Sequence, residues 1–211
     1  RSQLGVLAPA VRRAAGDDLR HHEAMSGTLE VRVLGAHDAV PAEAGGADRL
    51  EIVGNTVDGP LSPEPRVVAA VRDRTHVHLR PVVCLREGYS TDGGELVRLR
   101  GLISSYLDAG ADGLVFGFIN GAGAVDAEVV GALVDGFTCP WTFSRAFDTV
   151  LDTDRAWQDV RGLPGIDGVR TAGSARDLEH GLDDVIRRAS TDPGIAMPEV
   201  GRSTVHKEGA A

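Results

Sequence analysis

The stretch Leu29-Glu30-Val31-Arg32-Val33-Leu34 alternates apolar with charged side chains, and Arg49-Leu50-Glu51-Ile52-Val53 repeats this pattern 20 residues later. Side chains of a β-strand point alternately to the two faces of a sheet, so the charged set of each stretch shares one face. Parallel strands covered on both faces are normally continuous runs of Val, Ile and Leu. The two stretches therefore predict strands that pack against helices on one face and carry charged side chains on the other, interior face.

The rest of the chain alternates between strand-like runs and segments with helical spacing. The strand-like runs are 29–34, 49–53, 76–84, 113–118, 141–147, 168–171 and, more weakly, 194–200. The helical segments are 65–74, 94–109, 126–135, 154–161 and 175–190, with expected starts at Asp92, Asp152 and Ser174. This alternation indicates βα units and a parallel sheet.

The spacing of the strands favours a barrel. Successive runs start 20 to 37 residues apart, close to the roughly 31 residues per unit of an eight-stranded barrel. A doubly wound sheet is the alternative, but Gly35-Ala36-His37-Asp38 after the first run is not a glycine-rich nucleotide fingerprint. We predict an α/β fold, a TIM-type (β/α)8 barrel that is incomplete here, with six to seven βα units over residues 29–211.

Composition and charge narrow the classes of function. The 211 residues include 22 Lys and Arg against 31 Asp and Glu, a net charge of −9. This argues against a nucleic-acid partner, which would need clustered cations. No apolar run approaches the roughly 20 residues that cross a bilayer, so we expect a cytoplasmic protein without membrane contact. Residues 1–28 contain few large apolar side chains and are predicted to be a flexible N-terminal extension.

Polar side chains gather at the predicted strand ends, where barrels bind their ligands. The group consists of Glu30, Glu51, Arg86, Ser144, Arg145 and Asp148. Arginines provide fixed donors for an anion, and carboxylates can act as acid or base. The group predicts a site for a small anionic ligand. An interior ion-pair lattice, with Arg145 and Asp148 fastening a loop, is the alternative.

Three further residues are candidate metal ligands. His76 and His78 share a face of one predicted strand, and Cys84 ends that strand. The only other cysteine, Cys139, precedes the fifth strand, so the two thiols belong to opposite mouths of the barrel, about 15–20 Å apart. They cannot share an ion or form a disulfide. Alternating histidines at the start of a strand also serve in packing, so both uses stay open.

Several segments resemble the CutC family. GADRLE at 46–51 with GPLSP at 59–63 is similar to the GADR-x-E-L…GGLTPS signature of that family, and TFSRAFD at 142–148 is similar to its TFHRAFD motif. GADGLVFG at 110–117 and TAGS at 171–174 also resemble family segments. The resemblance runs from about Leu29 to Ser190. It implies a TIM-type barrel, a cytoplasmic and oligomeric protein, and a role in copper homeostasis with copper as the bound metal.

The chain departs from the family pattern at four places. Arg32 and Val53 stand where many relatives carry cysteines, which are natural soft ligands for Cu(I). Ser144 replaces the histidine of TFHRAFD, and Cys84 stands where an arginine is usual. The MAGGG and E-x-H-x-S segments expected near the C-terminus are missing.

These departures leave three functions open. The first is copper homeostasis. The second is a small-molecule enzyme or binding protein for a sugar phosphate or another anionic metabolite. The third is a degenerate relative that keeps only the scaffold. Because a barrel without its last strand leaves two unpaired edges, we also expect a homo-oligomer.

Overall fold

Parallel strands alternate with helices throughout the part of the chain that the computed structural model describes, residues 27–54 and 61–199. The strands are β1 (Glu30–Val33), β2 (Arg49–Ile52), β3 (His78–Pro81), β4 (Leu114–Phe116), β5 (Trp141–Phe143), β6 (Ile166–Thr171) and β7 (Ala196–Pro198). The helices are α2 (Ala36–Ala44), α3 (Pro65–Arg72), α4 (Gly93–Asp108), α5 (Ala127–Val134), α6 (Thr153–Arg161) and α7 (Leu178–Thr191). Two short 3-10 helices, η2 (Glu87–Tyr89) and η3 (Arg145–Thr149), follow β3 and β5.

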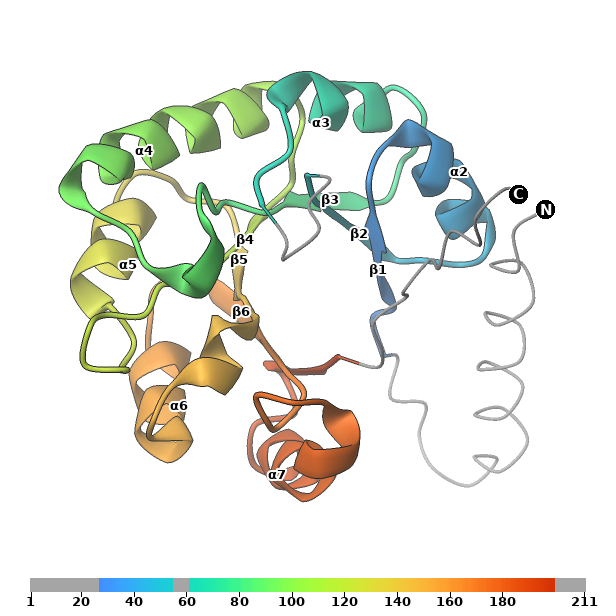
Figure 1. Cartoon of the computed structure of the whole chain (residues 1–211). Helices are drawn as coiled ribbons and strands as arrows, with labels where there is room; N and C mark the ends of the chain where they lie inside the picture. Colours follow the sequence, from blue (N-terminus) through green and yellow to red (C-terminus); the bar gives the residue numbers. More distant parts are fainter. Residues whose placement is uncertain (1–26, 55–60, 200–211) are drawn as a thin grey trace, which may run out of the picture.

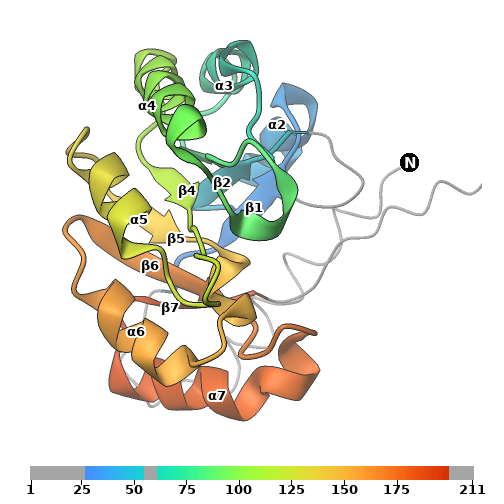
Figure 2. The same cartoon turned by 60° about the vertical axis from the view of Figure 1, so that its left-hand side comes forward.

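The strands follow one another around a common centre in sequence order. Strands β1, β2 and β3 form one parallel sheet, and β4 to β7 form a second. A parallel bridge between Val82 and Val115 joins the two sheets beyond the end of β3. The helices lie outside the strands in Figure 1 and in the turned view of Figure 2. This arrangement confirms the predicted incomplete TIM-type barrel, with β1 and β7 as its two end strands in the described residues.

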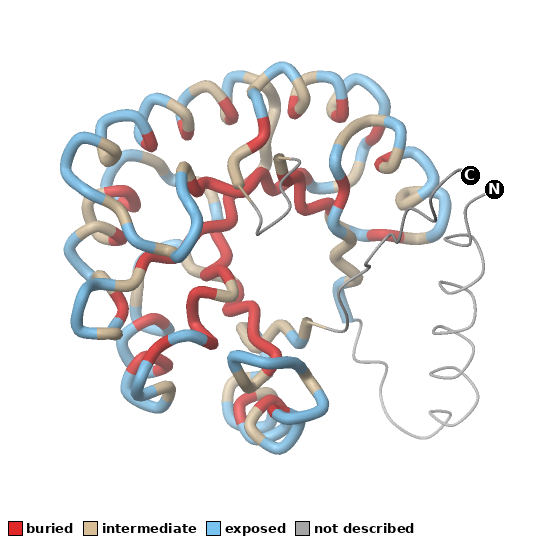
Figure 3. Tube along the Cα trace, viewed as in Figure 1, coloured by how far each residue is buried: buried red, intermediate tan, exposed pale blue. Residues whose placement is uncertain are grey.

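The main core lies between the strands and the helices. Leu50, Ile52 and Leu79 are fully buried there, and the ring of Phe116 stacks on Trp141 with 4.4 Å between centroids. Burying one such side chain stabilises the fold by about 1.5–3 kcal/mol. Figure 3 shows the central strands buried and the outer faces of the helices exposed. The two end strands are only partly buried.

Aspartates begin four of the helices. Asp92, Asp126, Asp152 and Asp177 each accept a hydrogen bond from the backbone N–H three residues later, at 3.0–3.2 Å. Such a cap is typically worth about 1 kcal/mol. The starts expected at Asp92 and Asp152 are confirmed. The start expected at Ser174 is wrong, because its Oγ accepts from Asp177 N at 3.1 Å in a turn that precedes α7.

Helix α2 was not expected from the sequence. It contains Pro41 and is built largely from alanine, so it lacks the apolar period that marks the other helices. Most of the extension expected at residues 1–28 lies outside the described residues. Among the helices that are described, none is long and apolar enough to span a membrane.

Candidate functional site

Charged side chains from neighbouring strands meet inside the barrel. The Cα atoms of Glu30 and Arg49 are paired in register, as are those of Arg32 and Glu51. On the next strand Arg80 is opposite Glu51. The apolar residues between them pack toward the helices, so these charged side chains share the interior face.

Arg170 of β6 lies at the centre of this interior network. Its Nη1 donates to Glu51 Oε1 and its Nη2 to Glu30 Oε1, while Arg32 Nε donates to Glu51 Oε2 over 2.5 Å. Burial alone would raise the pKa of Glu51, but Arg170 and Arg32 hold it below its usual value. Burial also opposes the charge on Arg170, yet Glu51 and Glu30 raise the pKa of this guanidinium. Glu51 and Arg170 are therefore charged at neutral pH.

A second set of contacts fills the amino end of the interior. Arg80 donates to both carboxylate oxygens of Asp167. Arg49 Nη1 lies 3.5 Å from Glu30 Oε2 and 3.9 Å from the thioether sulfur of Met197. A buried charge is costly unless it is paired and hydrogen-bonded. This end of the barrel therefore forms an ion-pair lattice, the alternative that the sequence left open.

The carboxyl mouth is organised around Asp148 in η3. Its carboxylate accepts from Arg145 Nε at 2.8 Å, from Ala172 N at 2.8 Å and from the hydroxyl of Thr171. Arg145 Nη2 donates in addition to the carbonyl oxygen of Ser174 at 3.1 Å. Asp148 thus holds the end of β6 against η3 and orients Arg145.

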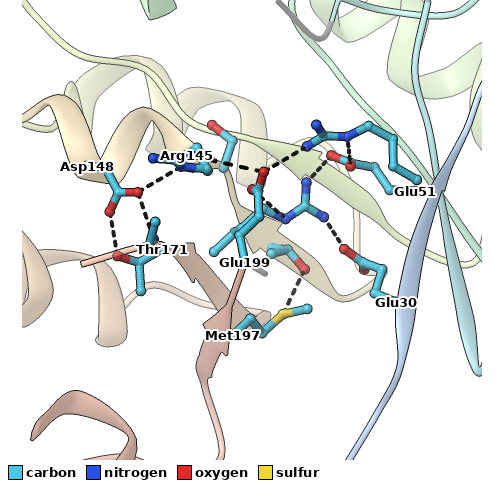
Figure 4. Close-up of polar contacts among 12 residues, drawn as sticks. Glu30, Glu51, Arg145, Asp148, Thr171, Met197 and Glu199 are labelled. Atoms are coloured by element: carbon cyan, nitrogen blue, oxygen red, sulfur yellow. Dashed lines mark hydrogen bonds and ion pairs between the residues drawn. The ribbon is translucent and has the colours of Figure 1, made fainter. Parts of the chain in front are cut away.

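Three guanidinium groups converge on Glu199, the last described residue. Arg32 Nη2 lies 3.8 Å and Arg145 Nη1 lies 4.0 Å from Glu199 Oε1, and Arg170 Nε lies 3.9 Å from Glu199 Oε2. Figure 4 shows Glu199 between Arg145 on one side and Glu51 on the other. The carboxyl mouth therefore holds three arginines around one carboxylate. We call Arg32, Arg145 and Arg170 the arginine cluster.

A small cavity of about 20 Å³ lies beside the arginine cluster, room for about one water molecule. It is lined by Arg32, Glu51, Val82, Val83, Cys84, Tyr89, Phe116, Gly117, Ser144, Arg145 and Arg170. Ser144 Oγ begins η3 by accepting from Ala146 N at 3.2 Å. Tyr89 has a φ of 60°, a left-handed conformation that is uncommon outside glycine and occurs often at binding sites.

The structure places Arg86 away from the arginine cluster. Its Nη2 lies 2.5 Å from Asp92 Oδ2 and its Nε lies 2.9 Å from Glu95. Both partners belong to the start of α4. The other predicted ligand-binding residues, Glu30, Glu51, Ser144, Arg145 and Asp148, all belong to the interior network or to the mouth.

The predicted metal ligands do not come together. Burial raises the pKa of the Cys84 thiol, which donates to the Arg86 carbonyl, whereas His76 and His78 are exposed at the opposite end of β3. Within residues 27–54 and 61–199, no group of three His, Cys, Asp or Glu side chains is placed to hold a metal ion. Cu(I) requires convergent sulfur or imidazole ligands, and the described residues do not fit that requirement.

The residues that complete the network were not predicted from the sequence. Arg170 and Arg80 lie at alternating positions of predicted strands, the same signal that marks Glu30 and Glu51. Glu199 gave no such signal, because β7 is only three residues long. Glu199 reaches the mouth because β7 pairs with β6, a long-range contact that the local sequence does not specify.

The fold and site define a TIM-type barrel protein with an ion-paired interior and an arginine-rich mouth at the carboxyl ends of its strands. The model of the CutC family matches residues 28–192, and the chain belongs to the CutC family. A CutC family protein of Xanthomonas axonopodis pv. citri (strain 306) is 32% identical over 180 residues, which cover 83% of this chain and 74% of that protein. One from Edwardsiella ictaluri is 30% identical over 186 residues, covering 85% and 73%.

Solved structures show the same fold. The CutC protein of Streptococcus agalactiae, named for copper homeostasis, matches with a TM-score of 0.72 at 18% identity and covers 77% of this chain and 81% of its own. Dihydrodipicolinate synthase of Agrobacterium tumefaciens matches with a TM-score of 0.58 at 15% identity, covering 81% of this chain and 61% of that one. At these identities the likeness is one of fold alone.

Proposed function

We propose that this CutC-family barrel binds a small anionic metabolite at the arginine cluster. One observation carries the proposal. Arg32, Arg145 and Arg170 each bind a partner in the network through at least one guanidinium nitrogen. Each also directs a further nitrogen at the position of the Glu199 carboxylate. Arginine is the residue best suited to hold carboxylate or phosphate groups in a fixed geometry. That position lies at the carboxyl end of the strands, where barrels bind their ligands.

The geometry favours binding over proton transfer by the predicted carboxylates. Both oxygens of Glu51 accept from guanidinium groups, and Asp148 accepts three hydrogen bonds. A general base needs a lone pair within reach of the substrate proton, whereas every oxygen of these two carboxylates already accepts a hydrogen bond from the protein. Their role in the proposal is to orient Arg32, Arg145 and Arg170.

Copper binding is the second candidate, and it rests on Cys84. This side chain lines the cavity at the mouth, but its thiol is buried with a raised pKa. The thiolate is the form that binds metals. No second sulfur and no imidazole joins it among the described residues that line the cavity. We therefore place anion binding first. A cytoplasmic location is part of the same proposal and is supported by the family resemblance.

Ligand-induced stabilisation tests the proposal. Thermal melts at low ionic strength should show a rising midpoint with inorganic phosphate, 2-phosphoglycolate or oxalate, because a ligand that binds only the folded state adds RT ln(1 + [L]/Kd) to its stability. Arg145→Met should weaken this response at least tenfold. Arg155→Met provides the matched control, since Arg155 is exposed on α6 and lies outside the mouth.

A second substitution separates binding from folding. Arg145→Lys keeps a cation beside Asp148 but removes the planar group that directs Nη1 into the mouth. We expect this variant to melt close to the parent protein and still to lose the response. Anions that stabilise Arg145→Lys as strongly as the parent would contradict the proposed site.

A further inference from the structure

Glu199 is held at the arginine cluster by charge and not by side-chain hydrogen bonds. Its three guanidinium neighbours lie 3.8–4.0 Å from its oxygens, beyond the roughly 3.2 Å at which an N–H···O hydrogen bond forms. Glu199 Oε2 is buried and has no hydrogen-bond partner. A buried carboxylate oxygen in this state loses its hydration without full compensation.

The three arginines do not depend on Glu199 for their positions. Arg32 is fixed by Glu51, and Arg170 is fixed by Glu51 and Glu30. The third, Arg145, is fixed by Asp148 and the Ser174 carbonyl. The cluster would therefore keep its shape if the Glu199 carboxylate moved away.

Charge balance favours an anion at this point. The described interior network and mouth contain five arginines, Arg32, Arg49, Arg80, Arg145 and Arg170. Apart from Glu199, the carboxylates paired with them are four, Glu30, Glu51, Asp148 and Asp167. Each arginine keeps another carboxylate partner when Glu199 is removed, but the group as a whole then carries one positive charge in excess. This excess favours either Glu199 or a bound anion at the cluster.

The backbone around Glu199 allows such an exchange. Glu199 follows β7, the partly exposed end strand, and its N–H donates to the Thr171 carbonyl at 2.9 Å. The arginines, in contrast, come from β1, β6 and η3, and their guanidinium groups are fixed by the partners named above. The 20 Å³ cavity is too small for a metabolite while the Glu199 carboxylate is in place, and Arg32, Arg145 and Arg170 line it as well as contact Glu199.

We propose that Glu199 is an internal occupant of the anion site and that the ligand is a phosphoryl compound that displaces it. The inference rests on the proposed function and adds to it the ligand class and a control by competition. A carboxylate offers two oxygens in one plane to three converging N–H groups. A phosphoryl group offers at least three oxygens in a tetrahedral arrangement, so each arginine gains an oxygen of its own.

Affinity for inorganic phosphate in Glu199→Gln tests this competition. Glutamine keeps the shape of the side chain and removes its charge, so the parent protein should bind phosphate at least tenfold more weakly than the variant by isothermal titration calorimetry. Adding Arg145→Lys to Glu199→Gln should reverse the gain. Glu128→Gln, an exposed glutamate on α5, is the matched control and should bind like the parent.

A second variant tests the same idea without an amide that could itself form hydrogen bonds at the cluster. Glu199→Ala should be stabilised by added acetate, which can take the place of the missing carboxylate, while the parent protein should not respond. Equal phosphate affinity in the parent and Glu199→Gln, with Arg145→Lys weakening both, would overturn the role of Glu199 and leave the anion site standing. Absence of binding by inorganic phosphate, 2-phosphoglycolate and oxalate in every variant would overturn both proposals.

Discussion

Charged side chains inside this barrel either pair with one another in the interior lattice or point into the mouth. Glu51 belongs to the first kind. It is 2% exposed, and both of its oxygens accept from arginines. The sequence predicts Glu51 as part of a ligand site, with a structural lattice as the alternative, and its contacts favour the lattice. Arg145 differs from it, because one of its nitrogens is directed into the mouth. We therefore expect substitutions at these two residues to act on different properties.

Glu51→Gln should reduce the free energy of unfolding by about 3 kcal/mol or more, as expected when one partner of a buried ion pair is removed. The amide cannot neutralise Arg170 and Arg32, which would keep their charges in the interior. Urea unfolding followed by circular dichroism measures the change. Glu64→Gln is the control, because Glu64 is exposed at the start of α3, and its transition should stay at the parent's midpoint. A loss below 1 kcal/mol in Glu51→Gln would show that the network tolerates an unpaired arginine.

The stabilisation by Glu51 should disappear in acid. Its pKa in the folded state lies below the usual 4.5 because of Arg170 and Arg32, despite the opposing effect of burial. A lowered folded pKa gives stability that is fully present above the unfolded pKa and is lost as the pH falls through the folded value. The difference in unfolding free energy between the parent and Glu51→Gln should therefore be constant above about pH 5.5 and shrink below 4.5. Urea titrations from pH 7 to pH 3 measure it, and a difference that grows in acid would contradict the assignment.

Copper should bind weakly through the described residues. Cys84 and Cys139 both have pKa values raised, first of all by burial, and they lie at opposite ends of the strands. A strong Cu(I) chelator should remove the metal completely, as followed by the absorbance of the chelator complex. The double variant Cys84→Ser with Cys139→Ser should behave like the parent. One copper per chain retained by that variant against the chelator would point instead to His76 and His78 or to residues outside the described part.

At the scale of elements, the contact between the end of β6 and α7 positions the mouth. Gly173 has a φ of 73°, and a Cβ added there would overlap the carbonyl of Gly181 in α7. A Cβ on Gly181 would in turn overlap the carbonyl of Ala172. The two backbones therefore pack directly against each other, and this contact places the Ser174 carbonyl that Arg145 contacts.

Gly181→Ala should destabilise the protein by about 1–3 kcal/mol, the usual cost of overpacking, because α7 would have to move away from β6. Gly101→Ala is the matched control in α4, since a Cβ there meets no atom within 4 Å. At such an open position inside a helix, alanine in place of glycine should raise the free energy of unfolding by about 0.5–1 kcal/mol. Thermal melts of the two variants should therefore shift in opposite directions, and a shift of Gly181→Ala toward higher temperature would show that the contact can relax.

The elements that the sequence predicted are those with a strong local signal. Strand alternation located β1 and β2, and capping aspartates located the starts of α4 and α6. Helix α2 was missed because its alanine-rich sequence with an internal proline has no clear apolar period. Of the candidate site, the mouth residues of η3 followed from their place after a strand, but Glu199 depended on tertiary closure. Pairing partners such as Arg170 for Glu51, 119 residues apart, are set by that closure and not by local pattern.

At the scale of the whole molecule, the described strands leave the ring open between β1 and β7. In the described residues β1 pairs only with β2, and β7 only with β6. Unpaired strand edges present backbone donors and acceptors to other chains. Helix α7, which packs beside this opening (Figure 1), also exposes Leu182 and Ile186 four residues apart on one face, at 48% and 54%. The unpaired strand edges and an exposed apolar face of α7 thus occur in the same part of the molecule.

We therefore predict that the chain self-associates through this side of the molecule. Light scattering at micromolar concentration should show dimers or larger assemblies for the parent protein. Leu182→Lys with Ile186→Lys should shift the population toward monomer, because it charges the apolar face of α7 without touching the strands or the mouth. Val97→Lys is the matched control, since Val97 is 71% exposed on α4, away from the opening, and should leave the mass unchanged. A parent protein that stays monomeric and keeps its thermal midpoint on dilution would contradict the prediction, because it would mean that the ends of the sheet are already closed within one chain.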